Sequence, residues 1–275
     1  MADKTKKNPD AAGKMPVLFI GHGSPVNIIL KNDFTRALAK LGRELPKPEA
    51  IMVISAHWLT RGTYVTCMER PRTIYDFYGF PQELYKIGYP SPGAPGQAGL
   101  VKEYIKKVPI ECNTDWGLDH ASWAILKHMY PEADIPVFEM SLDYSFNEWD
   151  PKPLQYHYEL ASGLAGLREK GILIIGSGNV VHNLGLIDFR DINAKTYDWA
   201  VEFDEKLKFN LLHKNHRELI NYKDMGEEAS LAVPTLDHYL PMIYTIALQG
   251  KNEPLTFVYE GFQNASISMR CFRIG

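Results

Sequence analysis

Short apolar runs that end in glycine-rich, histidine-bearing turns constrain the fold of this chain most strongly. The first run spans Val17 to Ile20 and is followed at once by the turn Gly21-His22-Gly23-Ser24-Pro25. Four consecutive apolar residues bounded by turn residues are typical of a strand that is buried on both faces. Ligands of open α/β proteins bind beyond the carboxyl ends of such strands, so His22 lies where chemistry is expected.

A second apolar run repeats this pattern after an intervening helix. Residues 32–41 carry apolar side chains at helical spacing, and Ile51 to Ala56 then lead directly into His57. A helix that crosses over between two strands makes them parallel, with their carboxyl ends at the same edge of the sheet. We therefore expect His22 and His57 to be neighbours in space.

Strands and helices alternate along the rest of the chain. Strand-like runs occur at residues 135–140, 172–175, 255–259 and 265–274, and helical periodicity at 96–107, 121–129, 154–167, 198–212 and 235–249. This alternation predicts an α/β fold with helices flanking a largely parallel sheet. No linker rich in glycine, serine or proline divides residues 15–275, which we therefore predict to form a single domain.

The composition favours small-molecule partners. The 275 residues include 30 basic and 33 acidic side chains without a long run of either sign, and the formal charge is −3. We therefore expect neither nucleic-acid nor membrane binding, and no apolar run approaches the roughly 20 residues of a membrane span. The polar, lysine-rich residues 1–14 lack the apolar core of a signal peptide and are predicted to be a disordered leader.

Three cysteines, Cys67, Cys112 and Cys271, are scattered widely along the chain. Their odd number and wide spacing argue against a disulfide framework and against a cysteine zinc site. A reducing compartment is the expected environment, and we predict a cytoplasmic protein. The sequence does not define the oligomeric state, although a homo-oligomer is compatible with it.

Three further histidines lie at the boundaries of expected elements. His182 follows the strand-like run 172–175, and His120 precedes the helix 121–129. His238 is in the first turn of the helix 235–249, about 200° from Leu236 on the core stripe at 100° per residue. His238 is therefore expected to face solvent or a pocket.

Together these histidines favour a metal centre. One histidine after a strand is more often a hydrogen-bonded boundary residue than a ligand, but several such positions change that balance. A catalytic transition metal needs about three protein ligands and an open position, which His22, His57 and one later histidine can supply. The remaining histidines are interpreted as solvated or structural: His128, His157, His213 and His216.

Residues 73–85, TIYDFYGFPQELY, contain five aromatic side chains around Gly79 and Pro81. This composition predicts a surface loop and not a regular element. The loop can wall a pocket for an aromatic ligand. It can equally pack its aromatic side chains onto the body of the protein or form a dimer contact.

Seven motifs in the same order resemble the class III extradiol ring-cleavage dioxygenases, LigB-like, in the branch of the DOPA 4,5-dioxygenases. The motifs are LFIGHGSP, ISAHW, TIYDFYGFP, WGLDHASW, GSGNVVHN, PTLDHYLP and EGFQNASISM, and they run from Leu18 to Met269. The resemblance implies a single α/β domain with a mixed central sheet and one non-haem metal. It also implies O₂-dependent opening of a catechol ring beside its two hydroxyls.

The same resemblance implies roles for individual residues. His22, His57 and His238 match the metal ligands, and His182 matches an acid/base histidine that is also a candidate fourth ligand. His120 matches a second histidine near the substrate, which would donate a hydrogen bond to the developing anion. The ring of the substrate would be walled by Trp58, Tyr75, Phe77 and Phe80.

The resemblance does not fix the metal. The wider family closes its site with a glutamate, whereas this branch uses a third histidine, His238. A site with one carboxylate suits Fe(II), while an all-histidine site also suits zinc. One divalent ion per chain is expected, Fe(II) in the active enzyme or Zn(II) in the protein as it is purified. The glycines beside His22 would let substrate and O₂ approach that ion.

Two other classes of function remain open on the sequence. A zinc-dependent hydrolase would use the same histidines to activate water, although no glutamate base accompanies them. A non-catalytic, Memo-type binding protein on the same scaffold is the other alternative. The physiological catechol and the position of ring cleavage are not defined by the sequence.

Overall fold

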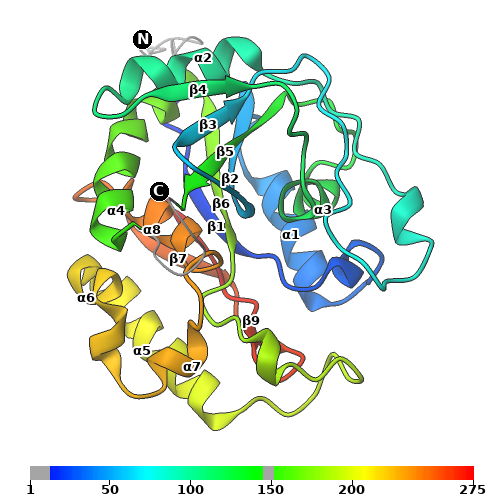
Figure 1. The fold of residues 1–275 in the computed structure, drawn as a ribbon, viewed down its shortest axis with the longest axis vertical. Coiled ribbons are helices and arrows are strands. Elements are labelled where there is room, and N and C mark those ends of the chain that lie inside the picture. Colours follow the sequence, from blue (N-terminus) through cyan, green and yellow to red (C-terminus); the bar gives the residue numbers. More distant parts are fainter. Residues whose placement is uncertain (1–12, 145–151) are drawn as a thin grey trace, which may run out of the picture.

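The computed structural model describes residues 13–144 and 152–275, and these build a mixed sheet between two layers of helices (Figure 1). Eight strands of the described residues form the sheet in the order β4-β3-β5-β2-β6-β1-β10-β7. Their bounds are β1 Val17–Gly21, β2 Ala50–Thr60, β3 Thr63–Thr66, β4 Ile110–Asn113, β5 Val137–Asp143, β6 Ile172–Gly178, β7 Leu255–Tyr259 and β10 Cys271–Ile274. A separate pair consists of β8 Phe262–Gln263 and β9 Ile267–Ser268.

The central strands are parallel and the edges are not. Strand β6 lies between β1 and β2 and pairs in parallel with both, and β2 also pairs in parallel with β5. Strand β10 is antiparallel to β1 and β7, and β3 is antiparallel to β5. The predicted α/β class with a mixed, largely parallel sheet is therefore confirmed. The carboxyl ends of β1, β2 and β6 meet at the same edge.

Helices cover both faces of the sheet because its strands are apolar on both sides. Helices α1 and α3 lie on one face and α4 and α8 on the other (Figure 1). In β1, Leu18 and Ile20 belong to the core on the side of α1 and α3, and Val17 and Phe19 belong to the core on the side of α4 and α8. The helix bounds are α1 Asp33–Glu44, α2 Pro95–Tyr104, α3 His120–Met129, α4 Leu154–Ser162, α5 Asp198–Leu212, α6 His216–Ile220, α7 Ala229–Ala232 and α8 Leu240–Ile246.

The element boundaries at two histidines differ from the prediction. Strand β2 continues to Thr60, so His57 lies within it and not beyond its end. Pairing of β2 with β6 nevertheless stops at Ser55, which leaves His57 at the edge. Helix α8 begins only at Leu240, so His238 lies in the preceding turn and not in a first helical turn.

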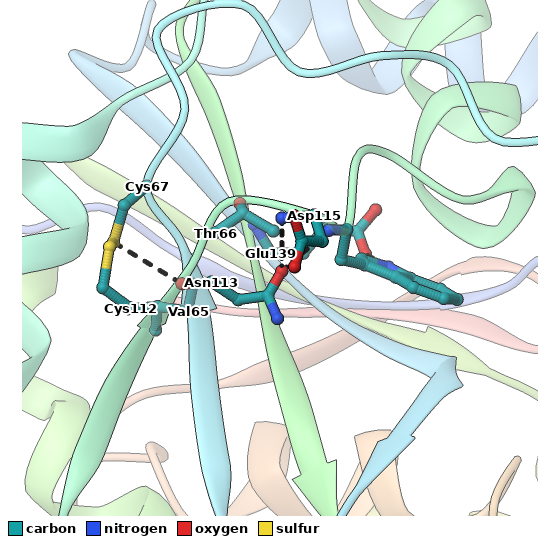
Figure 2. The surroundings of a disulfide bond; sticks show 8 residues. Val65, Thr66, Cys67, Cys112, Asn113, Asp115 and Glu139 are labelled. Atoms are coloured by element: carbon teal, nitrogen blue, oxygen red, sulfur yellow. Dashed lines mark hydrogen bonds between the residues drawn. A yellow bond between two sulfur atoms is a disulfide. The ribbon is translucent and has the colours of Figure 1, made fainter.

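The short strands β3 and β4 were not predicted, and a disulfide joins them. Cys67 directly follows β3, and its Sγ is bonded to that of Cys112 in β4 (Figure 2). The argument against a disulfide framework therefore fails for these two cysteines, because sheet pairing brings together residues 45 positions apart. The cysteines no longer support a reducing compartment, and the cytoplasmic location stays a prediction. Cys271 is free and buried.

Two further expectations concern the ends of the chain and its apolar segments. The predicted leader, residues 1–14, falls mostly outside the described residues. Among the described helices, none combines the length and the apolar composition that crossing a bilayer requires.

Candidate active site

His22 follows β1 and is held by the neighbouring strand β6. Its Nδ1 lies 3.1 Å from Ser177 Oγ, and that hydroxyl donates to the carbonyl oxygen of Ala121 at 2.6 Å. A hydroxyl has a single proton, so Ser177 accepts from Nδ1 of His22. The neutral ring then directs the lone pair of Nε2 into the site.

The glycines beside His22 are required by the backbone of the turn and by its close neighbours. Gly23 has a φ of +62°, and a Cβ there would lie 2.5 Å from Sδ of Met269. At Gly21 a Cβ would lie 2.8 Å from the carbonyl oxygen of Arg270. The turn needs glycine because its backbone packs against the segment before β10.

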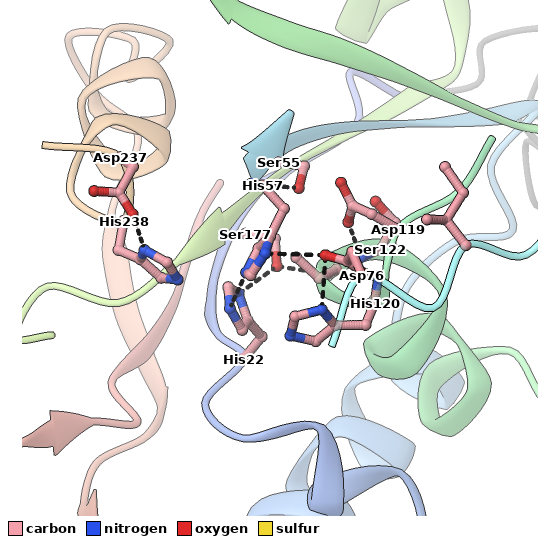
Figure 3. Close-up of polar contacts among 12 residues, drawn as sticks. His22, Ser55, His57, Asp76, Asp119, His120, Ser122, Ser177, Asp237 and His238 are labelled. Atoms are coloured by element: carbon pink, nitrogen blue, oxygen red, sulfur yellow. Dashed lines mark hydrogen bonds and ion pairs between the residues drawn. The ribbon is translucent and has the colours of Figure 1, made fainter. Parts of the chain in front are cut away.

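His57 is oriented by a carboxylate from the aromatic loop. Asp76 Oδ2 lies 3.0 Å from His57 Nδ1 (Figure 3). Burial opposes ionisation of Asp76, but hydrogen bonds from His120 and His57 hold the pKa of that carboxyl below its usual range. Burial also lowers the pKa of His57, yet the bond to Asp76 and the charge of Asp119 raise it overall. The two carboxylates therefore stabilise the protonated ring of His57 relative to a free histidine, and a metal ion on Nε2 would take the place of that proton.

His238 has an equivalent carboxylate partner next to it in the sequence. Its Nδ1 is hydrogen-bonded to Asp237 Oδ2 (Figure 3). The carbonyl oxygen of His238 accepts the backbone N–H of Asn179 at 2.9 Å, which fixes the turn against the end of β6. With Nδ1 engaged, Nε2 is the nitrogen of His238 that can bind a ligand.

These three histidines fit a metal ion. One ligand atom from each of His22, His57 and His238 lies within 4.8 Å of the others. The Nε2 atoms of His22 and His57 are 3.3 Å apart. Two nitrogens bound tetrahedrally to zinc at about 2.0–2.1 Å lie about 3.3–3.4 Å apart, so the pair matches that spacing. The Nδ1 partners fix the rings as such ligands require.

His120 begins α3 and shares the carboxylate of Asp76 with His57. Its Nδ1 lies 2.9 Å from Asp76 Oδ2, and its backbone N–H donates to Oδ1 at 2.9 Å. Burial, aided by the nearby His57, lowers the pKa of His120 to about 4. The neutral ring therefore keeps its proton on Nδ1 and presents Nε2 as an acceptor. It can take a proton or a hydrogen bond, and it donates only after protonation.

His182 lies against His238 on the opposite side of the site. The two rings are stacked, with centroids 3.5 Å apart and an interplanar angle of 8°. Burial, and then the neighbouring His238, lower the pKa of His182 well below its ordinary value. The imidazole is therefore neutral at pH 7 and able to accept a proton. It also belongs to a second possible ligand group with Asp237 and His238.

A pocket of about 300 Å³ opens onto all five histidines. Phe77 and Phe80 line it, whereas Trp58 and Tyr75 are not among its lining residues. Trp58 is buried and stacks on Trp116, with ring centroids 5.6 Å apart. The hydroxyl of Tyr75 donates to the carbonyl oxygen of Ile87 at 3.2 Å. Of the four residues proposed to hold the ring, two are therefore placed to do so.

The other histidines lie outside this pocket and have local partners. His128 contacts the carbonyl oxygen of Asn27, His157 the hydroxyl of Tyr244, His213 the carbonyl oxygen of Phe209, and His216 the Tyr158 hydroxyl and the Gln249 side chain.

Several residues of the site were not singled out from the sequence. Asp76, Asp237 and Ser177 orient the three histidines, and all three belong to quoted motifs. Asp119 caps α3 by accepting the backbone N–H of Ser122. Burial, and then the charge of Asp76, raise the pKa of Asp119 to about 6. A carboxylate adjacent to a candidate ligand is the signal that could have identified Asp237.

A comparison with known families and proteins agrees with this geometry. Residues 16–268 match the family model described as the catalytic LigB subunit of aromatic ring-opening dioxygenase. The chain belongs to the LigB family. It is 45% identical over 266 residues, 95% of each chain, to the 4,5-DOPA dioxygenase extradiol of Escherichia coli K12. It is 34% identical to the 4,5-DOPA dioxygenase extradiol of Mirabilis jalapa, over 89% of this chain and 90% of the other.

A solved structure supports the same assignment. A crystal structure of an uncharacterized Escherichia coli K12 protein superimposes with a TM-score of 0.81 at 42% identity, covering 95% of this chain and all of the other. The predicted family is confirmed, and the protein is a LigB-type ring-cleaving dioxygenase. Enzymes of this family depend on a metal, and the histidine cluster with its carboxylate partners can hold one.

Proposed function

We propose that this LigB-family enzyme opens the ring of a DOPA-like catechol next to its two hydroxyls. One C–C bond of the ring breaks, and both atoms of O₂ enter the product. The observation that carries the proposal is the convergence of His22, His57 and His238 in one pocket, each with its ring held through Nδ1. The relatives named 4,5-DOPA dioxygenase extradiol support this substrate class.

We assign His22, His57 and His238 as metal ligands, with Fe(II) as the active ion and Zn(II) as an ion that the site also accepts. A bound metal would lower the pKa of the catechol hydroxyls and bring the diol and O₂ together. His182 accepts the first proton from the diol, because its ring is neutral and lines the pocket. It is also the candidate fourth ligand before substrate binds.

His120 acts on the other side of the diol. Its Nε2 accepts a hydrogen bond or proton from the substrate, and the protonated ring then donates to the oxygen on which charge develops. Asp76 holds the ring in that tautomer. Phe77 and Phe80, which line the pocket, flank the aromatic ring.

The carboxylates of the pocket favour ring cleavage over zinc-dependent hydrolysis. A hydrolase of that kind needs a carboxylate free to activate water. In the described part of the pocket the only lining carboxylate is Asp76, which is bound to His57 and His120. It is therefore unsuited to act as that base.

The test is anaerobic reconstitution with Fe(II), addition of L-DOPA or another catechol, and admission of air. We expect one O₂ consumed per catechol and a yellow ring-opened product. The zinc-loaded protein is the control and should consume no O₂, because zinc has no second redox state. Absence of O₂ uptake across a panel of catechols would refute the proposal.

A further inference from the structure

The pocket has two chemically different parts. Its floor carries the ionisable side chains, the five histidines together with Asp76. Its walls are mostly apolar and come from the aromatic loop and the segment after His182: Phe77, Tyr78, Phe80, Leu184, Ile187 and Phe189. Among the described residues, no lysine, arginine or glutamate lines this pocket. A charged substituent on a substrate ring would therefore meet no side chain of opposite charge on the walls.

The polar side chains of the described walls are hydroxyl and amide groups, those of Ser24, Tyr78 and Asn264. Ser24 Oγ accepts the backbone N–H of Val26, and Asn264 Nδ2 donates to the carbonyl oxygen of Asp188 at 2.8 Å. Neither contributes a formal charge. The walls formed by the described residues thus carry no guanidinium or ammonium group, the side chains that bind a carboxylate most strongly.

Arg190, the cation that follows a pocket residue in the sequence, is paired with a carboxylate. Arg190 follows Phe189, but its Nε and Nη2 lie 3.0 and 2.9 Å from the two carboxylate oxygens of Asp188. Its side chain is 90% exposed, and Arg190 is absent from the pocket lining. The bidentate pair directs the guanidinium to Asp188 and not to the pocket.

Apolar side chains extend from the floor to the mouth of the pocket. Leu184, Phe189 and Tyr78 are 57%, 74% and 92% exposed, although large apolar side chains gain free energy when covered. A substituent on the ring carbon opposite the diol would run from the histidines along these side chains. An apolar substituent gains there, whereas a charged one loses water without gaining a partner.

We propose, resting on the function proposed above, that the preferred substrate is a catechol with an uncharged, apolar substituent opposite the diol. The amino-acid side chain of DOPA is then tolerated and not selected. Phe77, Leu184, Ile187 and Phe189 set this preference, because they supply the surface against which the substituent packs.

A matched pair of ligands tests the proposal. 4-Propylcatechol has the same three side-chain carbons as L-DOPA but lacks the ammonium and carboxylate groups. Binding is measured anaerobically by calorimetry on the zinc-loaded protein, which does not turn over. We expect 4-propylcatechol to bind at least about tenfold more tightly than L-DOPA, and about fourfold more tightly for each methylene added to 4-methylcatechol. Equal or tighter binding of L-DOPA would overturn the proposal.

Two variants locate the effect. Phe189→Ala should reduce the preference for 4-propylcatechol over 4-methylcatechol, whereas Phe209→Ala, on an exposed phenylalanine of α5 outside the pocket, should not. Arg190→Ala should leave the affinity for L-DOPA unchanged. A loss of L-DOPA binding in Arg190→Ala would mean that a cation recognises the substituent, which contradicts the proposal.

The outcome can be separated from the test of the proposed function. If the Fe(II) protein consumes O₂ with both ligands but binds L-DOPA better, the function stands and the preference is wrong. If no catechol supports O₂ uptake, the function is wrong, and the affinities of the zinc form still decide the preference.

Discussion

Asp76 connects two histidines that the sequence places 63 positions apart, His57 and His120. One oxygen, Oδ2, lies 3.0 Å from His57 Nδ1 and 2.9 Å from His120 Nδ1. Oδ1 accepts the backbone N–H of His120 as well. A single carboxylate thus sets the tautomer of one candidate ligand and one candidate proton acceptor.

Replacing Asp76 should therefore weaken metal binding. Asp76→Asn keeps the shape but removes the charge that orients His57, and we expect a 10–100-fold loss of affinity. Competition with a chromophoric chelator for Zn(II) measures the effect. Asp134→Asn, on a surface carboxylate paired with Lys47, is the matched control. Wild-type affinity in Asp76→Asn would show that the contact does not orient a ligand.

His182 should be required for turnover more than for metal retention. Its ring stacks on His238 and lies outside the group of His22, His57 and His238. In His182→Ala we expect kcat to fall about 10²–10⁴-fold, the usual contribution of a general base, with metal content nearly unchanged. Metal analysis and O₂ uptake are measured together, with the exposed His213→Ala as control. A variant that kept turnover, or lost its metal, would contradict the acid/base role.

The histidines were predictable from the sequence, and of their carboxylate partners only Asp237, next to His238, carried a signal. His22 and His57 follow apolar runs, a position that identifies the edge of a parallel sheet. Asp76 lies in a loop without periodicity, so no pattern indicates where its side chain points. Trp58 was wrongly expected to contact the substrate. It follows His57 directly in β2, and because side chains alternate along a strand, Trp58 points to the other face and stacks on Trp116.

At the level of elements, a buried histidine joins two helices. His157 of α4 is fully buried, and its Nδ1 is 3.0 Å from the hydroxyl of Tyr244 in α8. Its Nε2 has no hydrogen-bond partner among the described residues. Burial lowers the pKa of His157 to about 4. The packing of α4 on α8 therefore requires the neutral ring.

This pairing predicts a pH dependence of stability. The unfolded chain protonates His157 near pH 6.5 and the folded protein only near pH 4, so the unfolded state binds more protons between these values. The contribution of His157 is complete above pH 6.5 and is lost as the pH falls to 4, by about 3 kcal/mol at most.

Urea unfolding of the metal-free protein between pH 4 and 7 measures this effect. His157→Gln can keep the bond to Tyr244 without titrating, so it should lose up to about 3 kcal/mol less than wild type on acidification. His213→Gln controls for the loss of one histidine. The same pH slope in His157→Gln and wild type would refute the assignment.

Elements with strong periodicity or long apolar runs were predicted well, and short ones were not. The strands β1 and β6 and the helices α1, α3 and α5 lie close to their expected positions. Strands β3 and β4 have four residues each, three of the four in β4 are exposed or partly exposed, and both strands gain their pairing only from the sheet. The disulfide between Cys67 and Cys112 depends on that pairing. Such contacts arise from tertiary structure and leave no local signal.

At the level of the whole molecule, the sheet gathers ligands from distant parts of the chain. Strand β6 pairs with both β1 and β2, which aligns His22 and His57, and Asn179 at its end binds the carbonyl oxygen of His238. The three candidate ligands therefore meet only in the folded protein. An ion bound by all three has little affinity for the unfolded chain, so binding stabilises the fold.

Metal binding should therefore raise the melting temperature, and His22→Ala should abolish this effect. At 100 times the dissociation constant the ion contributes about 2.7 kcal/mol, or roughly 5–10 °C for a protein of this size. Scanning calorimetry with and without Zn(II) gives the shift. His22→Ala removes one ligand and one hydrogen bond to Ser177, so its metal-free melting temperature should stay within a few degrees of wild type. If zinc stabilised His22→Ala as strongly as wild type, His22 would not be a ligand.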